Sequence, residues 1–127
     1  ISDPVVEGSV NLEEAIETAD VISLHIPPIE ENVGVVNESF LAKMKDGASI
    51  VNTARGALVD EFALARELES RRIFAYLDVF VEEPYSGPLT KYIGANLFAS
   101  PHIASTSSSF FASMAEDFRE FHVGFPQ

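Results

Sequence analysis

Apolar residues along this chain gather into four short runs, at positions 21–26, 48–52, 74–79 and 96–100. Each run is nearly continuous in apolar character instead of alternating with polar residues. Such continuity is typical of strands that are covered on both faces. The four runs therefore predict four buried strands.

The segments between these runs carry apolar residues at helical spacing. Three of them begin at a side chain that commonly caps a helix, namely Asn11, Asn37 and Asp60. We expect the second helix to stop at Gly47 and the third to continue to about residue 71. A last helix is predicted after residues 101–102, with apolar positions as far as Phe121.

The alternation of strand and helix predicts β-α-β units, and hence a parallel sheet with helices on both faces. The glycines form no G-x-G-x-x-G motif. The predicted fold is therefore α/β, a partial Rossmann-like doubly wound parallel sheet with flanking helices that lacks the first strand and the glycine-rich turn. Residues 82–95 form one long irregular stretch, and loops of that length are usually functional or insertions.

Charge and composition narrow the classes of partner. The chain has 20 acidic and 8 basic residues, a net charge of −12, which disfavours nucleic acid and anionic membranes as partners. The lack of cysteine excludes disulfides, zinc–thiolate sites and a thiol nucleophile, and we predict no metal site. No apolar run approaches the ~18 residues of a membrane span, and the N-terminus has no signal-peptide features. We expect a soluble, cytoplasmic protein.

Polar and ionisable residues follow each predicted strand, close to a proline or glycine. In open parallel sheets, ligands bind beyond the carboxyl ends of the strands. Arg55, Glu83 and His102 follow three different strands and would share one rim of the sheet. Arginine binds a carboxylate through its planar fork, and histidine changes its charge near neutral pH, which suits it to proton transfer.

Each of these residues also has a simpler interpretation when taken alone. Arg55 is often the ion-pair partner of a nearby acid in such a position, and a turn histidine such as His102 often only hydrogen-bonds the backbone. Glu83 is often a solvated carboxylate, and Glu82 is an equal candidate by composition. Together the residues favour an anionic substrate that exchanges a proton with the protein, and a redox step would need a cofactor.

Four strings in the chain resemble the D-isomer-specific 2-hydroxyacid dehydrogenases. The strings are ADVISLHIP (19–27), LAKMKDGASIVNTARGALVDEFAL (41–64), YLDVFVEEPYSGPL (76–89) and SPHIAS (100–105). They occur in the order and near the spacing of that family, and they cover most of residues 10–105. The resemblance implies hydride transfer between a nicotinamide cofactor and a small 2-hydroxy or 2-keto acid.

The resemblance also implies a role for individual residues. Arg55 would bind the substrate carboxylate, and His102 would be the acid/base. Glu83, which directly precedes Pro84, would pair with His102 in preference to Glu82. The residues implied to contact the cofactor are Asp78, which would meet the nicotinamide carboxamide, and Ile26, Pro27, Thr53, Ala54 and Ala104. The implied cofactor is NAD, with NADP left open, and the implied assembly of the full-length protein is a homodimer.

By the same resemblance, residues 1–105 are the C-terminal portion of a nucleotide-binding domain, and residues 106–127 form a helix that returns toward a substrate domain. We expect the chain to be a portion of an oxidoreductase and inactive on its own. An alternative of a different class stays open, namely a non-enzymatic, NAD(H)-binding regulatory or corepressor-like relative with the same fold.

Overall fold

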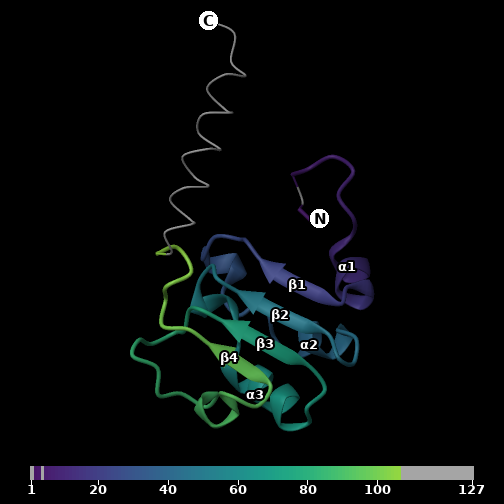
Figure 1. Ribbon diagram of the computed structural model, residues 1–127. Helices are drawn as coiled ribbons and strands as arrows, with labels where there is room; N and C mark the ends of the chain where they lie inside the picture. The colour runs from purple at the N-terminus through teal and green to yellow at the C-terminus, as the bar shows by residue number, and fades with distance from the viewer. Residues whose placement is uncertain (1, 4, 107–127) are drawn as a thin grey trace, which may run out of the picture.

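Four parallel strands form the sheet in the computed structural model, which describes residues 2–3 and 5–106 (Figure 1). The strands are β1 (Val21–Leu24), β2 (Ser49–Asn52), β3 (Phe74–Leu77) and β4 (Leu97–Ala99), and they lie side by side in chain order. Matching residues of neighbouring strands pair without a break, so that Ile22 lies opposite Ile50 and Ile50 opposite Ala75. All four predicted strands and their parallel pairing are confirmed.

The strands are shorter than the apolar runs that predict them. The pairing of β1 with β2 ends at Leu24 and Asn52. His25 and Ile26 lie beyond the last pair of this ladder, although the predicted strand extends to residue 26. Asp78 and Val79 likewise lie beyond the end of β3, although the Asp78 N–H still donates to the carbonyl of Asn52 at 3.0 Å.

Each helix begins at the cap that the sequence predicts. The Asn11 side chain accepts from the N–H of Glu13 at the start of α1 (Leu12–Thr18). Asn37 accepts from Phe40 N–H at the start of α2 (Glu38–Lys43). Asp60 accepts two N–H bonds at the start of α3 (Glu61–Glu69). Short 3₁₀ turns lie between these elements, namely η1 (Glu30–Asn32), η2 (Gly56–Leu58) and η3 (Thr90–Tyr92).

Two helices end earlier than predicted. Helix α2 ends at Lys43, before the left-handed Gly47, and α3 ends at Glu69 instead of near residue 71. The Arg72 guanidinium donates to the carbonyl of Met44, at a distance of 2.6 Å, and to that of Leu41. Arg72 thereby binds the Met44 carbonyl just after α2 and shares the Leu41 carbonyl with the N–H of Met44, so it helps to cap the C-terminal end of α2.

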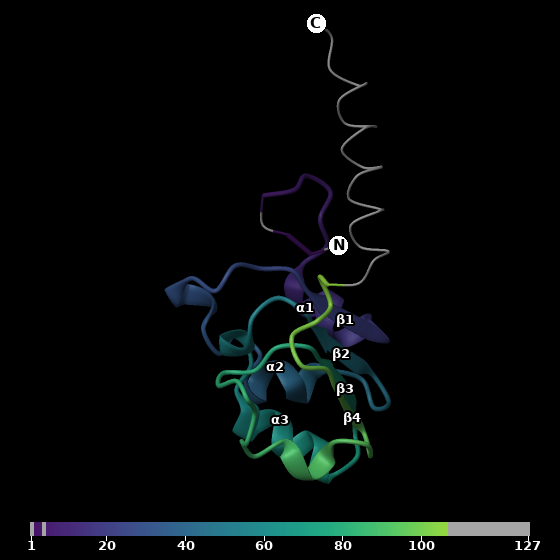
Figure 2. The same ribbon diagram turned by 60° about the vertical axis from the view of Figure 1, so that its left-hand side comes forward.

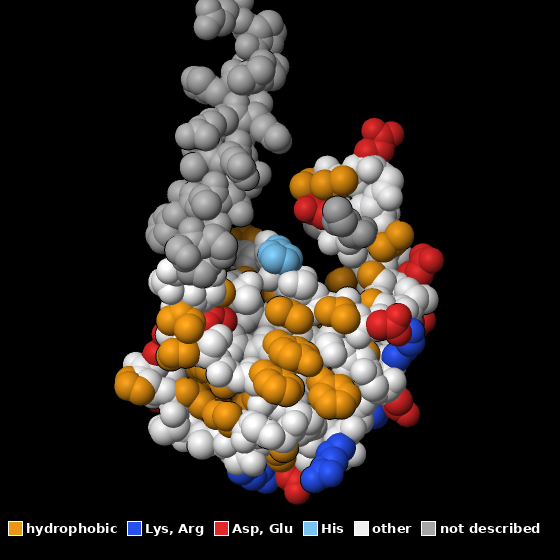
Figure 3. All heavy atoms as spheres, viewed as in Figure 1, with side chains coloured by type: hydrophobic (Ala, Val, Ile, Leu, Met, Phe, Trp, Pro, Cys, Tyr) orange, Lys and Arg blue, Asp and Glu red, His pale blue; other side chains and the backbone are white. Residues whose placement is uncertain are grey.

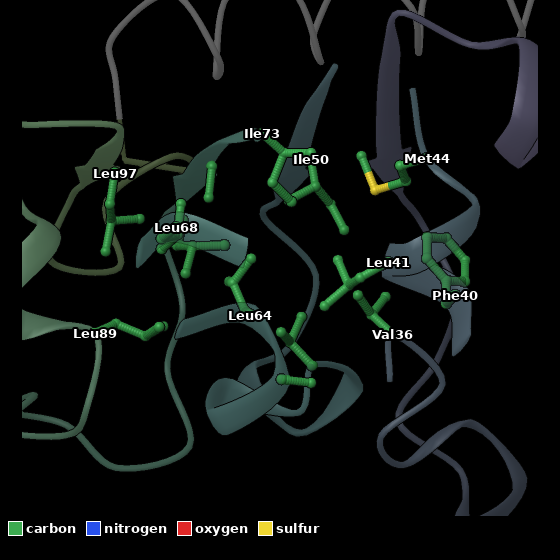
Figure 4. Close-up of a cluster of buried hydrophobic side chains, with 14 of the residues drawn as sticks. Val36, Phe40, Leu41, Met44, Ile50, Leu64, Leu68, Ile73, Leu89 and Leu97 are labelled. Atoms are coloured by element: carbon green, nitrogen blue, oxygen red, sulfur yellow. The ribbon is translucent and has the colours of Figure 1, made fainter. Parts of the chain in front are cut away.

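The hydrophobic core lies between one face of the sheet and the helices α2 and α3 (Figure 4). Strand residues on this face and helix residues that pack on them are fully buried, including Ile50, Leu97, Leu41, Leu64 and Leu68. Helix α1 packs beside α2 and contributes the buried Ile16. This core fixes the strand ends from which the candidate site is built.

The opposite face of the sheet carries exposed apolar side chains, which Figure 3 shows gathered over the strands. Tyr76 and Phe98 stack there with ring centroids 5.0 Å apart, and Phe98 is 51% exposed. Because the strands follow one another in one direction, right-handed crossovers place α2 and α3 on the same face, as Figures 1 and 2 show. Helices on both faces, as predicted, are therefore not found within residues 2–3 and 5–106.

Two further predictions, of a last helix and of no membrane span, concern residues that the structure describes only in part. The last predicted helix lies outside them, apart from its first positions before residue 107. Among the helices that the structure describes, none is both long enough and apolar enough to cross a bilayer.

Candidate active site at the carboxyl ends of the strands

A pocket of about 270 Å³ lies at the carboxyl ends of the strands. In Figure 1 the segment that contains residues 100–106 runs along this end of the sheet, where the strand arrows point. The residues that line the pocket come from the loops after β2, β3 and β4, and they are Thr53, Arg55, Asp78, His102, Ala104 and Ser105. The sequence names all of these as site residues except Ser105.

Glu83 is the carboxylate that contacts His102. Its Oε2 lies 3.0 Å from the Nδ1 atom of His102, and its Oε1 accepts from the N–H of Phe80 at 3.2 Å. The hydrogen bond with His102, and then the one from Phe80, hold the pKa of Glu83 below its usual value. Glu83 is thus ionised at neutral pH and only accepts hydrogen bonds. The proton between the two side chains therefore sits on Nδ1, which leaves the Nε2 atom of His102 for a ligand.

Asp78 holds the backbone around His102. His102 has a left-handed conformation (φ 56°) that is uncommon for a residue other than glycine, and its N–H donates to the Asp78 carbonyl at 2.9 Å. The Asp78 carboxylate accepts from Ser100 Oγ at 2.5 Å and from the N–H groups of Ile103 and Ala104 at 2.9 and 2.8 Å. These bonds clamp both flanks of His102.

The carboxyl group of Asp78 is buried, with 4% of the residue exposed. Burial alone raises its pKa, but the hydrogen bonds from Ser100, Ala104 and Ile103 together outweigh burial and hold the pKa below its usual value. Asp78 is therefore ionised at neutral pH. Its negative charge supports the loop that carries His102.

Replacing Asp78 by asparagine is expected to lower the free energy of unfolding by about 2–3 kcal/mol at neutral pH, because the amide cannot accept all three hydrogen bonds. The folded pKa lies below the unfolded one, so this stabilisation is present above a pH of about 3.9 and is lost as the pH falls through the folded pKa. In urea unfolding at a series of pH values, the free energy of unfolding should thus fall less steeply toward acidic pH in the variant than in the parent chain.

Asp46→Asn is the matched control, because this side chain is 88% exposed. We expect it to change the free energy of unfolding by about 0.5 kcal/mol or less. If the free energy of unfolding fell with acidic pH equally in Asp78→Asn and in the parent chain, the Asp78 carboxylate would not clamp the loop.

Arg55 lies at the rim of the pocket with its guanidinium exposed. Its Nη1 donates to the carbonyl of the preceding Ala54 at 2.6 Å, and no ion pair with an acidic side chain is found for it in the described part of the chain. The buried Asn52 fixes the turn, since its side chain donates to the Arg55 carbonyl and accepts from the Ala54 N–H. Arg55 is thus available to bind an anion in the pocket.

Gly56 permits the loops after β2 and β3 to touch. A Cβ atom at this position would lie 2.0 Å from the backbone carbonyl carbon of Phe80, far inside contact distance. Gly56 is not among the glycines with positive φ, so its role is close approach and not an unusual turn. The contact brings Arg55 and the loop of Glu83 to the same rim.

Not every predicted site residue reaches this pocket. Ile26 and Pro27 are exposed beyond the end of β1 and do not line it, and Ala54 is half-buried beside it. Sequence reasoning missed Asn52 and Ser100, whose bonds shape the site. Only their place in the sequence could have indicated this role, because each stands at the end of an apolar run and directly before a motif residue, Thr53 or Pro101.

Residues 2–104 match the family model described as "D-isomer specific 2-hydroxyacid dehydrogenase, NAD binding domain". The hydroxypyruvate reductase of Thermotoga maritima is 40% identical over 102 residues, which cover 78% of this chain and 33% of that protein. The glyoxylate reductase of Thermofilum pendens is 41% identical, and the match covers 84% of this chain and 32% of that protein.

Solved structures agree with the sequence comparison. The structure of D-lactate dehydrogenase from Aquifex aeolicus, complexed with NAD and lactic acid, aligns with a TM-score of 0.73 at 29% identity. The alignment covers 92% of this chain and 40% of that one. The chain spans about a third of the length of the two curated relatives named above.

Proposed function

Since this chain belongs to the D-isomer-specific 2-hydroxyacid dehydrogenase family, we propose that it supplies the nicotinamide site and the acid–base residues of an oxidoreductase. The substrate class is D-2-hydroxy acids and the corresponding 2-keto acids. The observation that carries this proposal is the Glu83–His102 pair, with 3.0 Å between its atoms, beside a pocket that Arg55 also lines.

The three side chains divide the work by their chemistry. The Arg55 fork binds the substrate carboxylate and orients the neighbouring C2 atom. The bond from Nδ1 to Glu83 fixes the His102 ring and leaves Nε2 to exchange a proton with the oxygen on C2. In reduction, protonated His102 gives the Nε2 proton to the ketone oxygen, and the Glu83 carboxylate stabilises the imidazolium that is needed for this step. In oxidation the neutral ring accepts the hydroxyl proton at the same atom.

NADH supplies the hydride when it is bound. The residues that fit its nicotinamide end are Thr53, Asp78 and Ala104, because they line the same pocket as His102. Backbone groups and a carboxylate beside the acid–base residue are suited to the amide of nicotinamide. Ile26, Pro27 and Ala54 are proposed to contact the cofactor outside this pocket.

The proposal is tested first on the 127-residue chain itself. We expect NADH to bind weakly and to shift the backbone NMR signals of Thr53 and Ala104, because these residues line the pocket. Adding a 2-keto acid should not oxidise the NADH, since the sequence has no glycine-rich pyrophosphate turn. Rapid NADH oxidation by the chain alone, or NADH shifts confined to residues far from the pocket, would contradict the proposal.

A further inference from the structure

The segment between β3 and β4 is anchored to both ends of α3 by tyrosines. Tyr85 donates to the carboxylate of Glu61, the first residue of α3, and Tyr92 donates to that of Glu69, the last residue. The two contacts have the same chemistry, but only Tyr85 lies close to Glu83 in the sequence, with Pro84 between them. The contact between Tyr92 and Glu69 therefore serves as a matched control for the contact between Tyr85 and Glu61.

Tyr85 is held from three sides. Its hydroxyl donates to Glu61 Oε2 at 2.9 Å and accepts from the N–H of Leu89 at 3.0 Å, and its ring stacks on Phe80 with centroids 4.1 Å apart. Burial, and then the Glu61 carboxylate, raise the pKa of Tyr85 to about 12. The group therefore stays a phenol and keeps donating to Glu61. A Cβ at Gly87 would lie 2.5 Å from this hydroxyl, so the segment wraps closely around it.

Glu83 lies between the two residues that form this stack. The Phe80 N–H donates to Glu83 Oε1, and Tyr85 follows Pro84 on the other side. Glu61 also accepts from the N–H of Val81, at 3.4 Å, through its second oxygen. Glu61 thus touches the loop on both sides of Glu83, at Val81 and at Tyr85. The position of the Glu83 carboxylate depends on how firmly these flanks are held.

We propose that Tyr85, anchored by Glu61 at the start of α3, is a positioning residue that fixes Glu83 against His102. The proposal rests on the proposed function for its effect on catalysis, although the contact itself is independent of it. Loss of the Tyr85 hydroxyl removes the bond to Glu61 and the bond from Leu89 while leaving the ring stacked on Phe80. The loop then holds Glu83 less closely to the Nδ1 atom of His102.

A double-mutant cycle in the protein encoded by the complete gene tests the catalytic part. We expect Tyr85→Phe to lower kcat for a 2-keto acid by about tenfold, as for the loss of one well-placed hydrogen bond. This loss should vanish in a Glu83→Gln background, because Tyr85 acts through Glu83. Tyr92→Phe, the same chemical change at the other end of α3, should leave kcat unchanged. A loss that persists in the Glu83→Gln background, or no loss, overturns the proposal.

An NMR measurement on the 127-residue chain tests the contact without any activity. At a pH where His102 is neutral, ring ¹⁵N shifts report which nitrogen carries the proton. We expect Nδ1–H in the parent chain and in Tyr92→Phe, and a shift toward Nε2–H in Tyr85→Phe. An unchanged ring in Tyr85→Phe overturns the proposal. If the unsubstituted protein encoded by the complete gene showed no turnover, only the proposed function would be contradicted. The NMR measurement would still test the contact, because it does not depend on activity.

Discussion

Replacing His102 by glutamine is expected to lower the kcat for 2-keto acid reduction by about 10²–10⁴-fold in the protein encoded by the complete gene. The reason is that the glutamine amide is too weak an acid to give a proton to the ketone oxygen, which is the role proposed for the Nε2 atom of His102. The measurement is steady-state oxidation of NADH, with the affinity for NADH determined in parallel. That affinity should stay close to the parent value, because His102 is proposed to act on the substrate.

Protein stability serves as the control for this variant. The His102 backbone is held by its N–H bond to the Asp78 carbonyl, which glutamine retains. We therefore expect a similar midpoint of urea unfolding. A fall in kcat of less than about tenfold would show that His102 is not the acid–base residue.

Arg55→Lys is expected to lower kcat/KM for a 2-keto acid by about hundredfold, mostly through a higher KM. A lysine ammonium keeps the charge but cannot bind both carboxylate oxygens through a planar fork. The matched control is Arg66→Lys, since Arg66 lies on α3 and pairs at 3.1 Å with an exposed Glu38. That variant should leave kcat and KM unchanged.

The two arginine variants together separate loss of the bidentate contact with the substrate from a general effect of replacing an arginine by lysine. Unchanged KM in Arg55→Lys would remove Arg55 from the carboxylate site. A rise in KM of equal size in Arg66→Lys would show that the effect of Arg55→Lys is not specific to the pocket.

Much of the fold was predictable because its signals are local. Asn11, Asn37 and Asp60 cap helices through bonds to residues two or three positions away, and such short-range chemistry is visible in a single sequence. The β-α-β alternation then restricts the sheet to parallel pairing. The rim shared by three strand ends follows from that pairing, so the convergence of Glu83 and His102 was predictable as well.

The remaining features depend on distant contacts. Composition alone gives Glu82 and Glu83 equal weight, and only the resemblance selects Glu83. Apolar residues on both faces of β3 predict cover on both faces, yet Phe74 and Tyr76 are exposed, because the direction of the crossovers decides which face the helices take. The contact between Tyr85 and Glu61 spans 24 positions, and no periodic pattern encodes it.

The reduction of 2-keto acids by NADH, catalysed by the protein encoded by the complete gene, tests the central claim most directly. The account predicts NADH oxidation that yields a 2-hydroxy acid of D configuration and that falls in both Arg55→Lys and His102→Gln. Tight binding of NADH without turnover of any 2-keto acid would contradict this account and favour a regulatory, NAD(H)-binding relative instead.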